Sequence, residues 1–232
     1  MNPVQLIKLS EQLLLEVKLQ KDSSALQLKL KELELALLEN SLINDERKKA
    51  FWINIYNAYY QILRIDRKVA LTDIYKKKLI SIAGKSLSLD DVEHGVLRRY
   101  RHKYSLGLFS NPLSPKFIKK NAVDILDYRI HFALNCGAKS CPPIAFYSPT
   151  NINAQLDRAT QSFLDEQSQF KDNRKVVSTT SLFKWFYFDF GGEKGIKRIF
   201  AEQLNKDISD YKITYTQYSW DEELVNFTAE NP

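Results

Sequence analysis

The segment 46–64 constrains the fold more than any other part of the sequence. It contains the run AFWINIYNAYYQIL, and its length and composition predict an α-helix capped by Asn44 or Asp45. Asn54 and Asn57 lie three positions apart and therefore share one face of this helix. Because the helix is otherwise aromatic, these amides have little access to water. We expect them to hydrogen-bond a neighbouring segment; the alternative is that one orients a catalytic histidine or donates to an oxyanion.

The rest of the chain predicts helices and short strands in mixed order. Helices are expected over residues 3–20, 24–40, 91–101, 152–170 and 193–204. Strands are expected in a hairpin within 79–89 around Gly84-Lys85, over 128–135, and at 175–178 and 212–216. Because the order lacks strict βαβ alternation, the predicted class is α+β, mostly helical with a small, mainly antiparallel sheet.

The helix predicted over 91–101 carries several side chains of interest. Asp90 fits its N-cap, and Glu93 completes a capping box. His94 lies four positions before Arg98, so the two share a face. Gly95 inside a helix costs stability relative to alanine, which indicates that another segment packs closely there.

The first 40 residues are predicted to form amphipathic helices that pack on the main domain. Their leucines recur at helical spacing, beginning with Leu6, Leu9 and Leu13. A coil that binds a partner is the alternative, although the pair is too short for a heptad zipper. Residues 41–232 are expected to form a single globular domain.

Composition excludes several protein classes. With 44% hydrophobic residues, the chain is a folded protein and not a disordered one. No run approaches the roughly 18 apolar residues that span a bilayer, and the start lacks the features of a secretory signal, so we expect a cytoplasmic protein. The net charge of +6 is scattered without a nucleic-acid-binding module, so no nucleic-acid partner is expected. Two cysteines are too few for a disulfide scaffold.

The stretch 127–143, DYRIHFALNCGAKSCPP, contains both cysteines and one of the three histidines. In the strand predicted there, Arg129 and His131 share one face, and Cys136 falls on the apolar opposite face as a buried, inert thiol. Cys141 follows a glycine-containing turn and precedes Pro142-Pro143, which places its thiol on a stiff loop. The alternative is that all these side chains are core.

Asp189 lies within the aromatic run SLFKWFYFDFGG. Its carboxylate is expected either to cap the following helix or to be held against a histidine or arginine.

The sequence resembles the family known as domain of unknown function 547. The matching pieces are AFWINIYNAYY (50–60), SLDDVEHGVLR (88–98), RIHFALNCGAKSCPPI (129–144), KWFYFDFG (184–191) and YSWDEEL (218–224). Together they span roughly residues 30–225, and the His-Phe-Ala segment with its two cysteines is the most specific. The resemblance implies kinship of fold. Papain-like and transglutaminase-like thiol enzymes are an analogy for these motifs, although the histidine precedes the cysteine here.

The first functional hypothesis is a cysteine-dependent hydrolase or acyltransferase that acts on a peptide or amide. Such chemistry needs a thiolate, a histidine, a group that fixes the histidine, and an oxyanion donor. Cys141 would be the nucleophile and His131 or His94 the base. The orienting and substrate-binding candidates are Glu93, Asp189, Asn54, Asn57 and Arg129, with backbone amides near 138–141 as further oxyanion donors.

Two other hypotheses compete with the thiol enzyme. The same residues could form a buried polar network in a non-catalytic structural or interaction module. A zinc site built from His94, His131, Cys136 and Cys141 has suitable ligand types, but no CxxC or HxxxH spacing supports it. We therefore expect no metal or cofactor, and a peptide or protein as the substrate.

Overall fold

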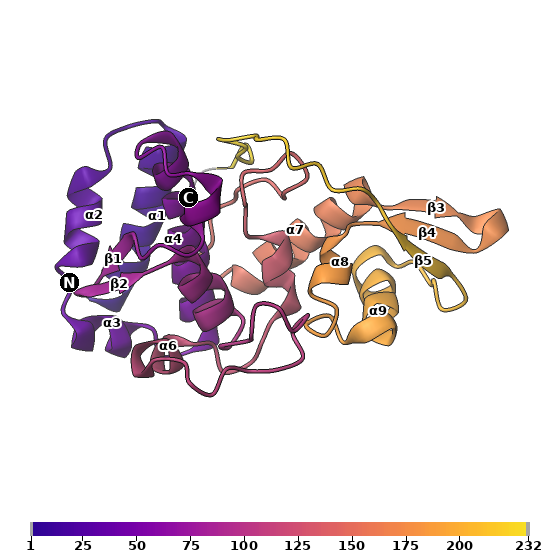
Figure 1. Ribbon diagram of the computed structural model, residues 1–232, viewed down its shortest axis with the longest axis horizontal. Helices are drawn as coiled ribbons and strands as arrows, with labels where there is room; N and C mark the ends of the chain where they lie inside the picture. Colours follow the sequence, from indigo (N-terminus) through magenta and orange to yellow (C-terminus); the bar gives the residue numbers. More distant parts are fainter. Residues whose placement is uncertain (1, 231–232) are drawn as a thin grey trace.

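The computed structural model describes residues 2–230 and has two lobes, each with its own hydrophobic core (Figure 1). The first lobe contains most of the helices and a hairpin: α1 (Pro3–Lys18), α2 (Ser24–Lys31), α3 (Leu35–Ser41), α4 (Asp45–Ile65), α5 (Leu71–Ile74), β1 (Ile80–Ile82), β2 (Lys85–Leu87), η1 (Asp91–Leu97) and α6 (Lys116–Asn121). The second lobe contains β3 (Gln169–Lys171), η3 (Asp172–Arg174), β4 (Val176–Thr179), α8 (Leu182–Trp185), α9 (Gly192–Leu204) and β5 (Lys212–Tyr215). The α+β class is confirmed.

Helix α4 is the centre of the first core. The Asn44 side chain accepts a hydrogen bond from the Arg47 amide, as the predicted cap requires. Every residue from Lys48 to Leu63 is buried, because α1 packs along one side and η1 and α7 (Ile152–Gln167) along others. A helix that is buried on all faces takes such an interior position in the fold.

The two asparagines of α4 attach the following chain to the core. The Asn54 side chain accepts from the Tyr147 amide at 3.0 Å and donates to its carbonyl at 2.8 Å. Asn57 accepts from the Asn135 amide and donates to the Ala133 carbonyl, both at 2.9 Å. The expectation of a hydrogen-bonding role toward a neighbouring segment is therefore confirmed, and both amides are fully buried.

The strands form two separate sheets. β1 and β2 form an antiparallel hairpin in which Ile82 pairs with Lys85, so the turn lies one residue earlier than expected, at Ala83-Gly84. In the second lobe, β3 pairs antiparallel with β4, and β4 pairs parallel with β5. This mixed sheet packs with α9 and α8 around a cluster of aromatic side chains that includes Phe183, Phe190 and Phe200.

Two elements join the lobes: α7 (Ile152–Gln167) and the short η2 (Tyr128–Phe132). The first part of α7 contributes Ile152 and Leu156 to the first core, and its last part contributes Phe163 and Leu164 to the second. In η2, Ile130 and Phe132 are likewise divided between the two cores.

The strand predicted over 128–135 is wrong. η2 is a 3₁₀ helix, which the Asp127 side chain begins by accepting a hydrogen bond from the Arg129 amide. Residues from Ile130 to Ala133 are all buried, because the chain runs between two cores and no face is left for solvent. Alternating residue types therefore could not separate an inner face from an outer one, and Arg129 and His131 do not share a face.

Two helices also differ from expectation. The helix predicted over 24–40 is interrupted between α2 and α3. The helix predicted over 91–101 is the π-helix η1, with bonds such as Arg98 N–H to the Glu93 carbonyl. It is capped by Ser88 and Asp91, which exchange side-chain and backbone hydrogen bonds, and not by Asp90.

Gly95 in η1 faces Ile118 of α6, where a Cβ would lie 2.9 Å from the isoleucine methyl, so the expected close packing is confirmed. Within residues 2–230, no helix combines the length and apolar character needed to cross a bilayer.

We predict that Asn57→Ala lowers the free energy of unfolding by roughly 2 to 5 kcal/mol, because the Asn135 amide and the Ala133 carbonyl both lose their buried partner. Urea unfolding followed by tryptophan fluorescence measures this loss. Asn173→Ala, at an exposed turn, is the control and should change stability by less than about 0.5 kcal/mol. A loss below about 1 kcal/mol for Asn57→Ala would show that water replaces the amide.

Candidate active site

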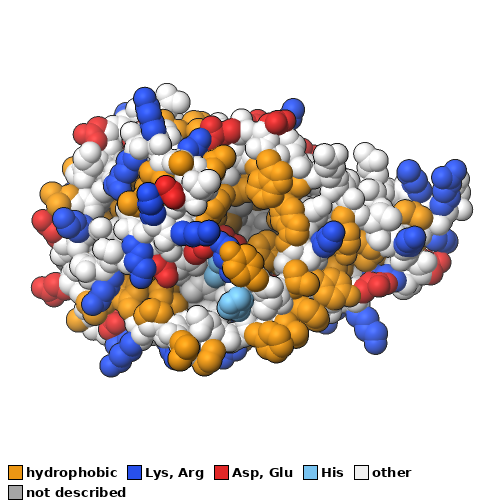
Figure 2. All heavy atoms as spheres, viewed as in Figure 1, with side chains coloured by type: hydrophobic (Ala, Val, Ile, Leu, Met, Phe, Trp, Pro, Cys, Tyr) orange, Lys and Arg blue, Asp and Glu red, His pale blue; other side chains and the backbone are white. Residues whose placement is uncertain are grey.

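A cavity of about 470 Å³ opens where the two lobes meet (Figure 2). Its walls come from α4, η1, the loop after η2, α8 and the C-terminal segment, and they are largely aromatic: Tyr56, Tyr75, Tyr104, Trp185, Phe186, Tyr218 and Trp220. Glu93, His94, His131 and Cys141 all line this cavity, so the structure brings together four of the residues predicted from the sequence.

His131 is held by a buried carboxylate. Its Nε2 lies 2.9 Å from Asp189 Oδ2, and the two side chains are 2% and 0% exposed. The imidazole also stacks on Phe186 with the ring centres 3.9 Å apart. The expectation that Asp189 is held against a histidine or an arginine is confirmed on both counts, because Arg98 Nε donates to the same oxygen at 2.6 Å.

Arg98 links the two histidines of the site. Its side chain is 0% exposed, and its Nη1 lies 2.8 Å from His94 Nδ1. Because a guanidinium can only donate, Nδ1 must be the acceptor. The guanidinium also lies 4.6 Å from the Phe186 ring centre. His94 and Arg98 are thus on one side of η1, as their spacing predicts.

The carboxylate of Asp189 is sealed by a loop that precedes α6. Gly107 in this loop has a φ of +89°, and a Cβ there would lie 2.1 Å from Asp189 Oδ1. Leu106 accepts a hydrogen bond from the Phe188 amide and fixes the loop against this segment. Only glycine fits at position 107, since both the backbone conformation and the close approach exclude a side chain.

The histidines and Asp189 have shifted acidities. Burial lowers the pKa of His94 to about 3, and Arg98 adds to the effect. Burial also lowers the pKa of His131, although Asp189 opposes the shift. Burial alone would raise the pKa of the Asp189 carboxyl, but His131 and Arg98 together lower it. These shifts favour two neutral imidazoles and an ionised carboxylate near neutral pH.

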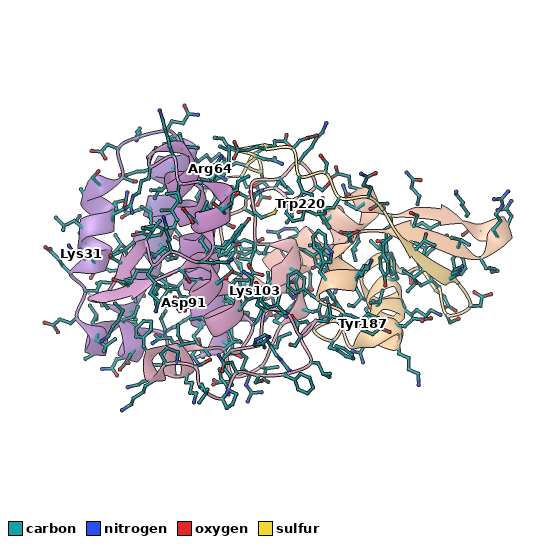
Figure 3. All side chains as sticks on the ribbon, in the orientation of Figure 1. Lys31, Arg64, Asp91, Lys103, Tyr187 and Trp220 are labelled. Atoms are coloured by element: carbon teal, nitrogen blue, oxygen red, sulfur yellow. A yellow bond between two sulfur atoms is a disulfide. The ribbon has the colours of Figure 1, made fainter. Side chains whose placement is uncertain are left out.

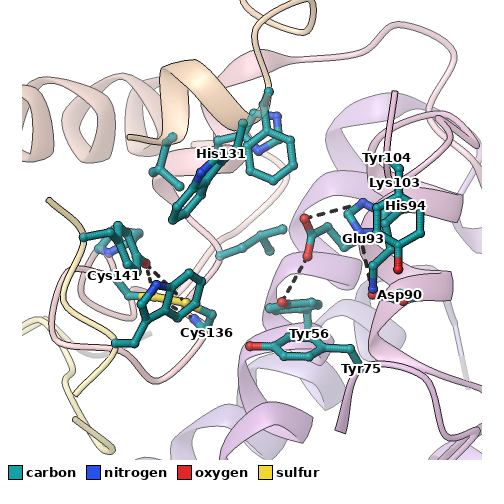
Figure 4. Close-up of a pocket in the computed structure, with 17 residues that line it drawn as sticks. Tyr56, Tyr75, Asp90, Glu93, His94, Lys103, Tyr104, His131, Cys136 and Cys141 are labelled. Carbon is teal, nitrogen blue, oxygen red and sulfur yellow. Dashed lines mark hydrogen bonds and ion pairs between the residues drawn. A yellow bond between two sulfur atoms is a disulfide. The ribbon is translucent and has the colours of Figure 1, made fainter. Parts of the chain in front are cut away.

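Glu93 projects into the cavity from η1 (Figure 4). The Tyr56 hydroxyl donates to Glu93 Oε2 at 3.1 Å, and Oε1 lies 3.6 Å from His94 Nδ1. The His94 Nε2 is 3.6 Å from Asp90 Oδ1. π-helical turns of this kind are frequent at functional sites, because they turn side chains away from regular helical positions.

The two cysteines form a disulfide, so the expected free thiols are absent in this structure. Cys136 is also half-buried and not enclosed in the core as predicted, whereas Cys141 is 6% exposed. The Tyr218 hydroxyl lies 3.1 Å from Cys141 Sγ, and the Cys136 amide donates to the same sulfur at 3.0 Å. Among residues 2–230, neither imidazole is hydrogen-bonded to Cys141.

Four predicted site residues do not line the cavity: Asp189, which contacts it through His131, and Asn54, Asn57 and Arg129. Asn54 and Asn57 are buried and hydrogen-bonded to the backbone of Tyr147, Ala133 and Asn135, so neither is placed to bind an oxyanion in the cavity. Arg129 forms ion pairs with Asp127 and Asp157, both at 2.7 Å, on the side of η2 toward α7.

Sequence reasoning did not assign site roles to Arg98, Tyr56 and Tyr218, which all contact predicted site residues. Signals for two of them were present. Arg98 lies one helical turn after His94, and Tyr218 begins the terminal YSWDEEL piece of the family resemblance. For Tyr56 the sequence gives no such signal, because α4 contains many other aromatic residues.

Comparison with known protein families identifies one match. The family DUF547, proteins of unknown function, matches residues 40–164, which is more than half of the chain. The chain belongs to the DUF547 family. Neither the curated proteins nor the solved structures contain a significant match. The papain-like analogy therefore stays a prediction.

The part of this DUF547 protein that matches the family contributes most of the cavity, including Glu93, His131 and Cys141. Asp189 and Tyr218 lie beyond it. Within the described residues, no group of three or more histidine, cysteine, aspartate or glutamate side chains is arranged to hold a metal ion.

We predict that His94 causes the free energy of unfolding to decrease as the pH drops below about 6.5. Its folded pKa of about 3 lies below the ordinary histidine value of 6.5, so the unfolded chain binds the extra proton first as pH falls. Between about pH 6.5 and 5 this costs roughly 1.5 kcal/mol. Urea unfolding at several pH values measures the slope of the free energy of unfolding against pH.

His94→Gln should remove this share of the slope, because glutamine does not titrate. His102→Gln, at an exposed loop position, is the matched control and should keep the wild-type slope. Identical slopes in His94→Gln and wild type would mean that His94 is protonated within the folded site.

Proposed function

We propose that this DUF547 protein is a cysteine-dependent hydrolase or acyltransferase for a peptide or amide substrate, active in its dithiol form. The observation that carries the proposal is the shared cavity: Cys141 and a carboxylate-backed imidazole, His131 on Asp189, belong to the same site. A nucleophile, a base and a group that orients the base are the constellation that thiol catalysis requires.

His131 is the better candidate for the base. Its Nε2–H donates to Asp189, and its Nδ1 makes no hydrogen bond to the described part of the chain. The Nδ1 lone pair is thus available to a thiol proton. In His94, by contrast, Nδ1 accepts from Arg98 and Nε2 faces Asp90. Asp189 is a positioning residue here, since it acts through His131.

Two donors surround the sulfur of Cys141. The Cys136 amide and the Tyr218 hydroxyl lie 3.0 and 3.1 Å from Sγ. Hydrogen bonds to the charged form of a group lower its pKa, so these donors would favour the thiolate. The Tyr218 hydroxyl would also replace Asn54 as the side-chain donor to an oxyanion.

The disulfide must be opened before catalysis. A dithiol reductant would transfer two electrons, leaving Cys136 and Cys141 as thiols and the reductant as a disulfide. Cys141 Sγ would then attack the carbonyl carbon while His131 takes the thiol proton. The proton passes to the leaving amine as the carbon–nitrogen bond breaks, and water or an amine resolves the thioester.

The disulfide itself favours the alternative function, a non-catalytic structural or interaction module. In that case the Cys136–Cys141 disulfide restricts the conformation of the loop after η2. Asn54 and Asn57 attach the same loop to α4 through hydrogen bonds. The two functions differ in one property: only the enzyme needs an activated thiol after reduction.

We predict that Cys141 of the reduced protein is alkylated by iodoacetamide with an apparent pKa below the usual thiol value of about 8.5, and faster than Cys136. His131→Gln should slow the reaction of Cys141 at neutral pH by roughly tenfold or more, because it removes the base. Mass spectrometry of each cysteine peptide over a pH series measures both rates.

His102→Gln is the matched control and should leave both rates unchanged. Incubation of the reduced protein with p-nitrophenyl acetate should further give an initial burst and an acetylated Cys141 peptide. Equal, slow alkylation of both thiols with ordinary acidity, and no acetylated peptide, would contradict the enzyme and leave the structural module.

A further inference from the structure

The Glu93 carboxylate has no cationic partner in the part of the chain that the structure describes. Its contacts are the Tyr56 hydroxyl at 3.1 Å and the His94 ring at 3.6 Å. No lysine or arginine nitrogen of the described residues forms an ion pair with it, and its side chain is 13% exposed. A carboxylate in such an enclosed position is stabilised when a positive charge joins it.

The neighbouring basic groups are hydrogen-bonded to other partners. Arg98 donates to Asp189 and to His94 Nδ1. Because His94 Nδ1 accepts that hydrogen bond, the ring is neutral and brings no charge to Glu93. The cavity lining therefore contains two carboxylates, Asp90 and Glu93, against a single ammonium, that of Lys103. It has a net negative charge inside a protein whose net charge is +6.

The walls beside Glu93 are suited to an organic cation. Tyr56 and Tyr75 lie below the carboxylate in Figure 4, and the Cys136–Cys141 disulfide lies across the cavity. Trp185 stacks on Trp220 with ring centres 5.4 Å apart at one side of the opening. Aromatic faces attract ammonium groups through their quadrupole, most strongly where water is excluded.

The cavity already accommodates one alkylammonium group, the side chain of Lys103. Its Nζ lies 2.6 Å from Asp90 Oδ2, and 6.0 and 5.8 Å from the ring centres of Tyr75 and Tyr104. Figure 3 shows Lys103 and Trp220 near the junction of the lobes. The Lys103 ammonium therefore lies beside a carboxylate and two aromatic rings. Glu93 offers a second carboxylate beside aromatic rings, and no lysine or arginine of the described residues is paired with it.

We propose that the cavity binds a primary alkylammonium group, such as a lysine side chain or a small aliphatic amine, with the ammonium on Glu93 and the alkyl chain along the aromatic wall. As an assignment of substrate class this rests on the proposed function, in which the amine is the leaving group or the acyl acceptor. As a binding site it depends on the cavity alone and needs no turnover.

The test is a titration of the wild-type protein, with its disulfide intact, by n-hexylammonium, n-hexanol and hexanoate at neutral pH. Tryptophan fluorescence reports binding, because Trp185 and Trp220 line the cavity. We expect n-hexylammonium to bind at least about tenfold more tightly than n-hexanol, and hexanoate to bind most weakly.

Glu93→Gln keeps an acceptor for the Tyr56 hydroxyl and removes the charge. It should bring the dissociation constant of n-hexylammonium to that of n-hexanol and leave n-hexanol binding unchanged, whereas Glu32→Gln on the exposed surface should change neither. The proposal is overturned if wild type binds the amine no more tightly than the alcohol, or if Glu93→Gln keeps the preference.

The ligand series in wild type decides the matter even if Glu93→Gln fails to fold. The titration uses the disulfide form and the alkylation uses the reduced form. The amine site can therefore fail while the thiol enzyme stands, and the reverse.

Discussion

The contact on which the site depends is the buried carboxylate of Asp189, shared by Arg98 and His131. Asp189 follows α8, Arg98 directly follows η1, and His131 belongs to η2, so the carboxylate joins both lobes at the cavity. Ions are costly to bury, and removing one partner of a buried pair typically costs about 3–5 kcal/mol. Gly107 keeps this carboxylate from water, which strengthens both of its hydrogen bonds.

Much of the helical framework follows from local sequence signals. Asn44 and the aromatic run after it define α4, and Asn54 and Asn57 predict a docked segment because a buried amide needs a partner. The strand predicted at 128–135 is wrong because periodicity identifies a strand only when one face is solvated, and η2 is covered by two cores. At the interruption between α2 and α3, the amides of Ala83 and Gly84 in the hairpin turn donate to the carbonyls of Leu30 and Lys31.

For the site, the sequence predicts which residues take part better than it predicts which of them are in contact. Glu93, His94, His131 and Cys141 meet at one cavity, although the sequence separates them by up to 48 positions. The sequence left Glu93, Asp189 and the asparagines of α4 as candidates to orient the histidine, and only the fold shows that Asp189 is the partner of His131. The Cys136–Cys141 disulfide was not expected, because a spacing of five residues specifies no geometry by itself. These features together describe a cavity lined by an imidazole, a disulfide and a carboxylate that has no lysine or arginine partner among residues 2–230.

The tautomer of His131 tests the central claim most directly. Because Asp189 is the acceptor for Nε2–H, long-range proton–nitrogen NMR of the ring at neutral pH, in the protein with its disulfide closed, should show a neutral imidazole with its proton on Nε2. That state leaves Nδ1 free to act as the base that the proposed thiol chemistry requires. An imidazolium, or a neutral ring with its proton on Nδ1, would contradict the account, because His131 could then accept no proton from Cys141.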